Sequence, residues 1–282
     1  EEAREMVKDK PYSFLHVDKA EIDLPKDMDL YDDRVYQKAR ENLDKLVEDG
    51  ILVQDDQPNY YIYQLMMDGR KQTGLVMGSS IDEYMDGTIK KHEFTRQDKE
   101  EDRIRHVDTC NAQTGPIFLA YSDHNQVDRL VEDWKENNQP VYDFTAEDGI
   151  SHTAWVVDDK EAQQTLTALF EEIPALYIAD GHHRTASAAK VALQRREENG
   201  SANDGSAYYF LSVAFPASQL HIFDYNRLVK DLVGNNKEEF LEKVAQAGFV
   251  VTPRGKEPYR PKEQGEFGMY LDGTWYLLDG KE

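Results

Sequence analysis

The sequence predicts a mixed α+β (α/β) fold in which helices flank one mixed sheet. Segments with helical periodicity alternate irregularly with short apolar runs typical of strands, and several strand pairs are separated by turn residues such as Asp-Gly. This irregular order argues against a regular doubly wound sheet. The 282 residues, 39% of them hydrophobic, are enough for one large domain or two smaller ones.

The first half of the chain contains the clearest single helix. Val35, Ala39 and Leu43 lie on one helical face, and Gly50 stands where a C-terminal cap belongs, so we expect a helix over residues 31–49. Ser80 and Glu83 form the pattern of a capping box, which predicts a short helix ending near residue 87. The other elements expected here are strands at 51–53, 60–67 and 73–77, a charged helix at 95–108, a strand at 116–121 and a helix at 123–137.

The second half alternates in the same way. Asp148-Gly149 and Asp272-Gly273 are turn signals, the second of them inside a hairpin. The expected elements are strands at 141–144 and 153–157, a helix at 159–170, a strand at 173–179, an Ala-rich helix from 185, a loop at 200–205, a strand at 208–215, a helix at 237–247 and a hairpin at 269–278.

The domain organisation follows from these elements. We expect an N-terminal α/β region at 1–150 and a C-terminal α/β region at 151–282, or one composite domain. The chain opens in a helical-looking segment without a starting Met, so both ends are expected to be cuts within a longer protein.

The composition limits the classes of partner that we expect this protein to bind. There are 55 acidic and 33 basic residues, and the resulting net charge of −22 repels nucleic acid and anionic membranes. No apolar run approaches the ~18 residues of a membrane span, and the single cysteine, Cys110, excludes an intrachain disulfide. We therefore expect a cytoplasmic protein with small-molecule partners, of unknown oligomeric state.

A DNA-binding interpretation has one supporting pattern. Residues 43–63, a helix, a glycine and two strands, loosely imitate a winged helix. That helix carries Asp44, Glu48 and Asp49, so its charge opposes DNA binding.

The pentapeptide Asp180-Gly181-His182-His183-Arg184 is the strongest chemical signal. It joins an apolar strand to an Ala-rich helix, where unpaired N–H groups and the positive end of the helix dipole form an anion site. Arg184 adds a bidentate donor, and the two histidines add groups that donate or transfer protons. The alternatives are a capped helix with structurally satisfied histidines, or a metal site using Asp180 and a histidine. No His-x-x-x-His or Cys-x-x-Cys partner lies nearby.

A second group of reactive residues precedes the charged helix. Residues 90–96 (Lys-Lys-His-Glu-Phe-Thr-Arg) form a basic island in an acidic chain, and Arg103 follows on the helix. We expect this island to line the same cleft as the pentapeptide, because an acidic protein that handles an anion must concentrate its positive charge. An ordinary polar loop is the alternative. Asn111, in a turn before a strand, is a further anion-binding candidate, and His152 is undecided alone.

The chain resembles the domain of unknown function 1015 family along nearly its full length. The matching segments are Ser13 to Val17, Gln72 to Val76, Ser80 to Tyr84, Lys91 to Glu93, Glu101 to Arg103, Gly115 to Phe118, His152 to Trp155 and Tyr177 to Ala189. The family is longer at both ends and usually carries a Pro-Pro-Tyr-Asp element upstream of Glu1, which this sequence lacks.

The pentapeptide turn alone is similar to the phosphate-binding motif of the ParB/sulfiredoxin superfamily, in the form carried by its free-serine kinases. That resemblance implies a ParB/sulfiredoxin-like core, ATP or ADP with Mg²⁺ as cofactors, and phosphoryl transfer to or from a small hydroxylated amino acid. The alternative that the superfamily offers is a nucleotide-binding regulator without turnover.

The resemblance assigns roles residue by residue. Gly181, His182, His183, Arg184 and Thr185 would bind phosphate. The catalytic residues would be Asp180, which could also bind Mg²⁺, His182, His183 and Glu93. The residues expected to bind substrate are Lys91, His92, Arg103, Asn111 and His152.

Overall fold

The computed structural model describes residues 1–199 and 205–280. The chain separates into two compact units, Glu1–His221 and Ile222–Glu282. The expected boundary at 150/151 lies inside a hairpin of the first unit's sheet, so the first unit extends well beyond it. Of the loop expected at 200–205, only Gly205 is among the described residues.

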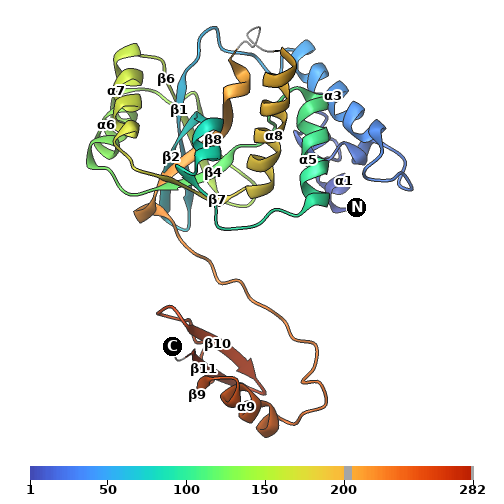
Figure 1. Cartoon of the computed structure of the whole chain (residues 1–282), viewed down its shortest axis with the longest axis vertical. Coiled ribbons are helices and arrows are strands. Elements are labelled where there is room, and N and C mark those ends of the chain that lie inside the picture. The colour runs from blue at the N-terminus through green and yellow to red at the C-terminus, as the bar shows by residue number, and fades with distance from the viewer. Residues whose placement is uncertain (200–204, 281–282) are drawn as a thin grey trace. The chain divides into compact units, whose positions relative to one another are not determined.

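The first unit is built on one mixed sheet (Figure 1). Its strands are β1 (Tyr60–Met67), β2 (Arg70–Ser80), β3 (Ile89–Lys90), β4 (Ile117–Tyr121), β5 (Tyr142–Thr145), β6 (Ser151–Val157), β7 (Leu176–Asp180) and β8 (Tyr209–Pro216). The spatial order is β3-β7-β4-β8-β2-β1-β6-β5. β3 pairs in parallel with β7 and β4 with β8, and the other neighbours are antiparallel. The mixed sheet predicted from the sequence is therefore present.

Some helices of this unit pack on the sheet, and others pack with the N-terminal segment. The helices are α1 (Glu2–Met6), α2 (Leu15–Asp18), α3 (Asp33–Glu48), α4 (Ile81–Asp86), α5 (Gln97–Cys110), α6 (Asn125–Asn137), α7 (Lys160–Glu171) and α8 (His182–Asn199), with short 3₁₀ turns η1 (Ala20–Asp23), η3 (Ser206–Tyr208) and η4 (Ala217–Gln219). In Figure 1, α6 and α7 lie beside β6 and β1, and α5 and α8 lie next to each other.

The main core lies between one face of the sheet and α4, α6, α7 and α8. Ile62, Leu75 and Ala214 are paired across neighbouring strands, point to the same face and are buried. Ala188 and Ala192 are buried on α8, and such small side chains let the helix lie close to the strands. The position of α8, and with it the pentapeptide, is thus fixed by the core.

A smaller core joins the N-terminal segment to α3 and α5. Ala20, Ala39 and Cys110 are buried together. Two polar contacts hold α2 nearby: the Thr114 hydroxyl donates to Asp18 at 2.6 Å, and His106 Nε2 lies 3.1 Å from the carbonyl oxygen of Val17. The end of α2 is therefore anchored next to the turn that precedes β4.

The second unit contains one helix and a small antiparallel sheet. α9 (Lys237–Gln246) begins with a capping box formed by Asn236 and Glu239. β9 (Phe249–Gly255), β10 (Glu266–Leu271) and β11 (Thr274–Gly280) pair in the order β10-β11-β9. The hairpin expected at Asp272-Gly273 joins β10 to β11.

The strand expected at 51–53 does not form. The N–H groups of Ile51 and Leu52 both donate to the carbonyl oxygen of Leu46, at 2.9 and 3.0 Å, and so complete the C-terminus of α3. The winged-helix interpretation fails at this point, because residues 51–59 contain no strand and its second strand, β1, pairs with β2 and β6 in the main sheet.

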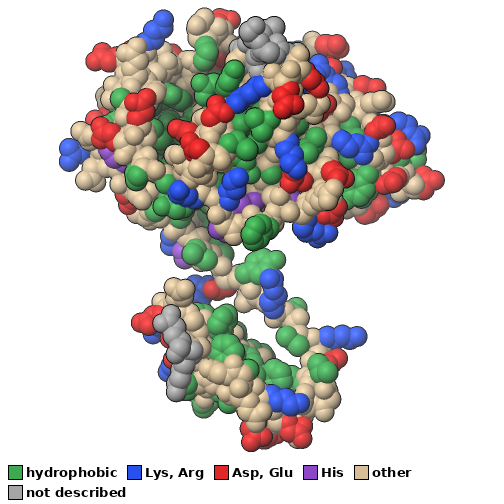
Figure 2. Space-filling view, in the orientation of Figure 1, with side chains coloured by type: hydrophobic (Ala, Val, Ile, Leu, Met, Phe, Trp, Pro, Cys, Tyr) green, Lys and Arg blue, Asp and Glu red, His purple; other side chains and the backbone are tan. Residues whose placement is uncertain are grey.

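The surface of the first unit carries many charged side chains, as the composition predicts. Figure 2 shows Asp and Glu side chains spread over the visible face of the first unit, with Lys and Arg among them. Within residues 1–199 and 205–280, no helix combines the length and the apolar character that crossing a bilayer requires.

Candidate functional site

The pentapeptide turn connects the last residue of β7 to the first turn of α8. Gly181 has φ +95°, a conformation that side-chain-bearing residues rarely adopt. The N–H and the hydroxyl of Thr185 both donate to the carbonyl oxygen of Gly181, at 2.9 and 3.0 Å, and close the first helical turn. The three N–H groups between these residues precede that bond and have no acceptor within the helix, so the turn presents donors for an anion.

A cavity of about 660 Å³ opens at this turn. Its lining comes from α2, the loop between β3 and α5, α5 itself and the pentapeptide. The lining residues are Leu15, Asp18, Lys19, Glu93, Lys99, Asp102, Arg103, Asp180, Gly181, His182, His183 and Arg184. Basic and acidic side chains are equally represented among them, which is a local departure from the net charge of −22.

Three of the cavity's cations form no ion pair with any described residue. Arg103 is paired with Asp102 at 2.8 Å. By contrast, the side chains of Lys19, Lys99 and Arg184 make no hydrogen bond or ion pair with the residues that the structure describes. Unpaired cations around one cavity are suited to an anionic ligand.

Arg184 lies against the turn that precedes β4. A Cβ atom added to Gly115 would be 3.0 Å from the Arg184 Nη1 atom and 3.2 Å from its Cζ atom. The absence of a side chain at Gly115 therefore leaves the space that the guanidinium group occupies.

The two histidines of the pentapeptide contact the basic island. His182 Nε2 lies 3.5 Å from the backbone N of His92, and the two rings meet edge to face with centroids 4.4 Å apart. His183 Nε2 accepts a hydrogen bond from the backbone N–H of Arg96 at 3.1 Å. On the other side of the His182 ring, Nδ1 lies 3.6 Å from Glu93 Oε2. The island and the pentapeptide, about 90 residues apart in sequence, are thus in contact, but of the island the cavity lining includes Glu93 and none of the basic residues.

The environment of His182 favours its neutral form. The side chain is 6% exposed, and burial lowers its pKa below the ordinary 6.5, with His92 adding to the effect. Glu93 and Asp180 oppose this shift. With Nε2 facing an N–H donor, the neutral ring carries its proton on Nδ1, toward Glu93.

An ion pair between the buried Glu100 and the exposed Lys190 joins α5 to α8. Glu100 is 6% exposed, pairs with Lys190 and accepts a hydrogen bond from the Thr95 hydroxyl at 2.7 Å. The Ser187 hydroxyl lies 3.2 Å from the backbone oxygen of Glu100. The hydrogen bond from Lys190 lowers the pKa of Glu100, and burial opposes that shift.

Five of the residues expected at the site do not line the cavity, and one of them, His92, still contacts the His182 ring. Lys91 is 3.8 Å above the ring of Tyr84 and does not line the cavity. Thr185 is fully buried, and both of its donors are used within the turn. Asn111 ends α5, where its side chain accepts from Arg195 at 2.5 Å. His152 is on β6, which four strands separate from β7, and bonds to the Tyr63 hydroxyl at 2.6 Å.

Five cavity residues were not singled out from the sequence as site residues. Leu15, Asp18 and Lys19 come from the short α2 region, and Lys99 and Asp102 precede Arg103 on α5. The first group adjoins Ser13 to Val17, a segment that matched the family, and that match was the available signal. Lys99 lies three residues before Asp102 and four before Arg103, the spacings of neighbours on one helix face.

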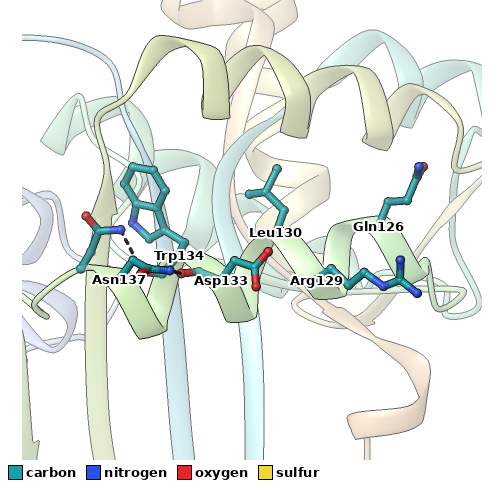
Figure 3. A pocket seen from close by; sticks show the side chains of 7 residues that line it. Gln126, Arg129, Leu130, Asp133, Trp134 and Asn137 are labelled. Atoms are coloured by element: carbon teal, nitrogen blue, oxygen red, sulfur yellow. Dashed lines mark hydrogen bonds between the residues drawn. The ribbon is translucent and has the colours of Figure 1, made fainter.

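A second pocket has fewer charged side chains than the cavity at the pentapeptide. Figure 3 shows a pocket of about 560 Å³ along α6, whose side chains include one cation, Arg129, and one carboxylate, Asp133. Its Trp134 is engaged in the fold, because the indole N–H donates to the carbonyl oxygen of Val156 at 3.0 Å. Over residues 1–199 and 205–280, no group of three or more His, Cys, Asp or Glu side chains is arranged to hold a metal ion.

Comparison with known proteins gives the family. The chain belongs to the family described as protein of unknown function (DUF1015), whose model matches residues 1–282. No curated protein matches the chain, and neither does any solved structure.

Proposed function

We propose that this protein is a nucleotide-dependent phosphoryl-transfer enzyme that acts on a small hydroxylated amino acid, with an activity like that of the free-serine kinases. One observation carries the proposal: in a chain of net charge −22, Lys19, Lys99 and Arg184 surround a cavity at a helix N-terminus without ion-pair partners among the described residues. The resemblance of the pentapeptide to a ParB/sulfiredoxin-type phosphate motif points the same way.

The phosphate groups of ATP or ADP would lie at the start of α8. The open N–H groups of the first turn and the planar fork of Arg184 supply donors there, with geometry suited to phosphate oxygens. Asp180 lines the same cavity and is available as a protein ligand for a Mg²⁺ ion, which would neutralise phosphate charge.

The mixture of charges in the cavity supports a zwitterionic acceptor. Lys19 or Lys99 could bind its carboxylate, and Asp18 its ammonium group, since these side chains line one cavity. Glu93, 60% exposed at its side chain, is the candidate general base. In the proposed reaction the acceptor oxygen attacks the terminal phosphorus, its proton passes to Glu93, and the shortened nucleotide leaves.

The test is direct detection of product. The full chain is incubated with ATP or ADP, Mg²⁺ and a panel of amino acids, and mass spectrometry is used to look for a phosphorylated amino acid. The matched control is Arg129→Ala, an exposed arginine on α6 outside this cavity. A product that the parent and Arg129→Ala form but Arg184→Ala does not supports the proposal. Bound nucleotide without product would indicate the regulatory alternative, and neither binding nor product would overturn both.

A further inference from the structure

We propose that the cavity selects an α-amino acid through two adjacent residues, Asp18 for the ammonium group and Lys19 for the carboxylate, and that Thr114 is the positioning residue that orients Asp18. The inference rests on the proposed function and deepens it by naming which part of the acceptor each side chain recognises. It also gives the turn before β4 a role at the site.

Asp18 is a cavity carboxylate that no protein cation neutralises. Its Oδ1 atom accepts a hydrogen bond from the neutral Thr114 hydroxyl at 2.6 Å, and the half-buried side chain makes no ion pair with any residue that the structure describes. By contrast, Asp102 is paired with Arg103 at 2.8 Å and accepts a hydrogen bond from the Tyr36 hydroxyl at 2.9 Å. A half-buried carboxylate without a cation is suited to the ammonium group of a ligand.

Lys19 supplies the opposite charge from the next position in the chain. Its exposed side chain lines the same cavity and has no hydrogen-bond or ion-pair partner in the described part of the chain. An α-amino acid carries its ammonium and carboxylate groups on one carbon atom, so Asp18 and Lys19 match its two charges. Lys99, also unpaired, has no such neighbour, because the carboxylate of Asp102 is already paired with Arg103.

The turn before β4 fixes Asp18 relative to the phosphate end of the cavity. The Gln113 side chain bonds to two backbone groups at the start of β8, at 3.1 and 2.5 Å, and so attaches the turn to the sheet. The next residue, Thr114, holds Asp18, and Gly115 leaves the space that the Arg184 guanidinium occupies. Three consecutive residues therefore connect the sheet, the acceptor carboxylate and the phosphate donor group, and the orientation of Asp18 depends on Thr114.

The experiment compares three acceptors that share a primary hydroxyl: L-serine, 3-hydroxypropionate, which lacks the ammonium group, and ethanolamine, which lacks the carboxylate. The full chain is supplied with ATP or ADP and Mg²⁺, and kcat/KM is measured for each acceptor. The parent should prefer L-serine to either analogue by about ten- to a hundred-fold, the effect of one charge-assisted hydrogen bond. Asp18→Asn should lose most of the preference over 3-hydroxypropionate and keep that over ethanolamine, and Lys19→Gln should do the reverse.

Two variants of Thr114 separate positioning from packing. Thr114→Val keeps the size of the side chain but removes the hydroxyl donor, so the preference for L-serine over 3-hydroxypropionate should fall about five-fold, through a higher KM for L-serine at unchanged kcat. Thr114→Ser keeps the hydroxyl and should behave as the parent does. A purely structural role would instead lower activity with all three acceptors alike, and would contradict the assignment of Thr114.

The outcomes distinguish this inference from the proposed function. A parent that phosphorylates L-serine and 3-hydroxypropionate equally well would overturn the inference and leave the phosphoryl transfer intact, as would an Asp18→Asn variant with the parent's preference. Product from none of the three acceptors would overturn both, and nucleotide affinity by calorimetry would then show whether nucleotide binding is also absent. Arg129→Ala, outside the cavity, is the matched control and should keep the parent's preferences.

Discussion

Replacing Arg184 by alanine separates a ligand-binding role from a structural one. Arg184 is exposed and makes no hydrogen bond or ion pair with the described residues, so the fold loses little when its side chain is removed. We expect the free energy of unfolding to change by no more than about 0.5 kcal/mol. If Arg184 binds phosphate through a charge-assisted bidentate contact, its loss should weaken nucleotide binding by about 1.5–3 kcal/mol, roughly ten- to a hundred-fold.

Isothermal calorimetry with ATP and with ADP, together with thermal melting, measures both quantities. Arg129→Ala is the matched control and should leave both unchanged, and Arg184→Lys should recover only part of the affinity, because an ammonium group cannot reproduce the planar fork. Unchanged affinity in Arg184→Ala would show that this side chain is no phosphate ligand. A much lower melting temperature, with unchanged binding per folded molecule, would show instead that the pentapeptide is a helix cap.

Gly115 gives an independent check on the geometry. A Cβ at 3.0 Å from Nη1 must displace the guanidinium group by a few tenths of an ångström, so Gly115→Ala should weaken binding, by about five-fold if roughly one hydrogen bond is lost. In the Arg184→Ala background the same substitution should have no effect. Additive losses in this double-mutant cycle would contradict the contact.

Three further outcomes are expected. Glu93→Gln should abolish product formation while nucleotide affinity by calorimetry stays within about two-fold, since an amide cannot accept the hydroxyl proton; full activity would exclude Glu93 as the base. His152→Ala should lower the melting temperature, because the bond to Tyr63 is lost, but leave nucleotide affinity unchanged; a large loss of affinity would contradict its placement outside the site. Because the pKa of Glu100 is lowered in the fold, its ion pair with Lys190 stabilises above about pH 4.5 and is lost as the pH falls below that value. Glu100→Gln should therefore show a smaller drop in melting temperature between about pH 5 and pH 3, and an unchanged drop would assign acid sensitivity to other carboxylates.

The pentapeptide could be found from the sequence because its chemistry is local. A carboxylate, two imidazoles and a guanidinium adjoin one glycine, and the flanking strand and helix have different apolar patterns. The mixed sheet followed from the same kind of pattern. The prediction of a strand at 51–53 was wrong, because an apolar run of three residues is as common after a helix end as in a strand. Here the backbone N–H groups bond to the carbonyl oxygen of Leu46 and complete the helix end.

The rest of the site depends on pairings that no local pattern encodes. β3 has only two residues, too few for periodicity, yet its parallel pairing with β7 brings the loop at 91–96 to the pentapeptide. α2 is a single turn whose position is set by distant contacts such as Thr114 with Asp18. His152 shows the converse: a histidine at a strand start gives no information on how many strands separate it from the site.

The parallel pairing of β3 with β7 also bears on how the protein folds. The cavity joins segments near residues 15–19, 93–103 and 180–184, so it exists only after two long chain closures, each of which costs entropy before its contacts form. We expect helices to form early in refolding from denaturant and nucleotide-binding competence to appear with the slowest phase; competence in the fastest phase would contradict this order. Newly made chains would then pass through a state that has secondary structure but no site, and a substitution that slows these closures would lower activity by reducing the number of competent molecules.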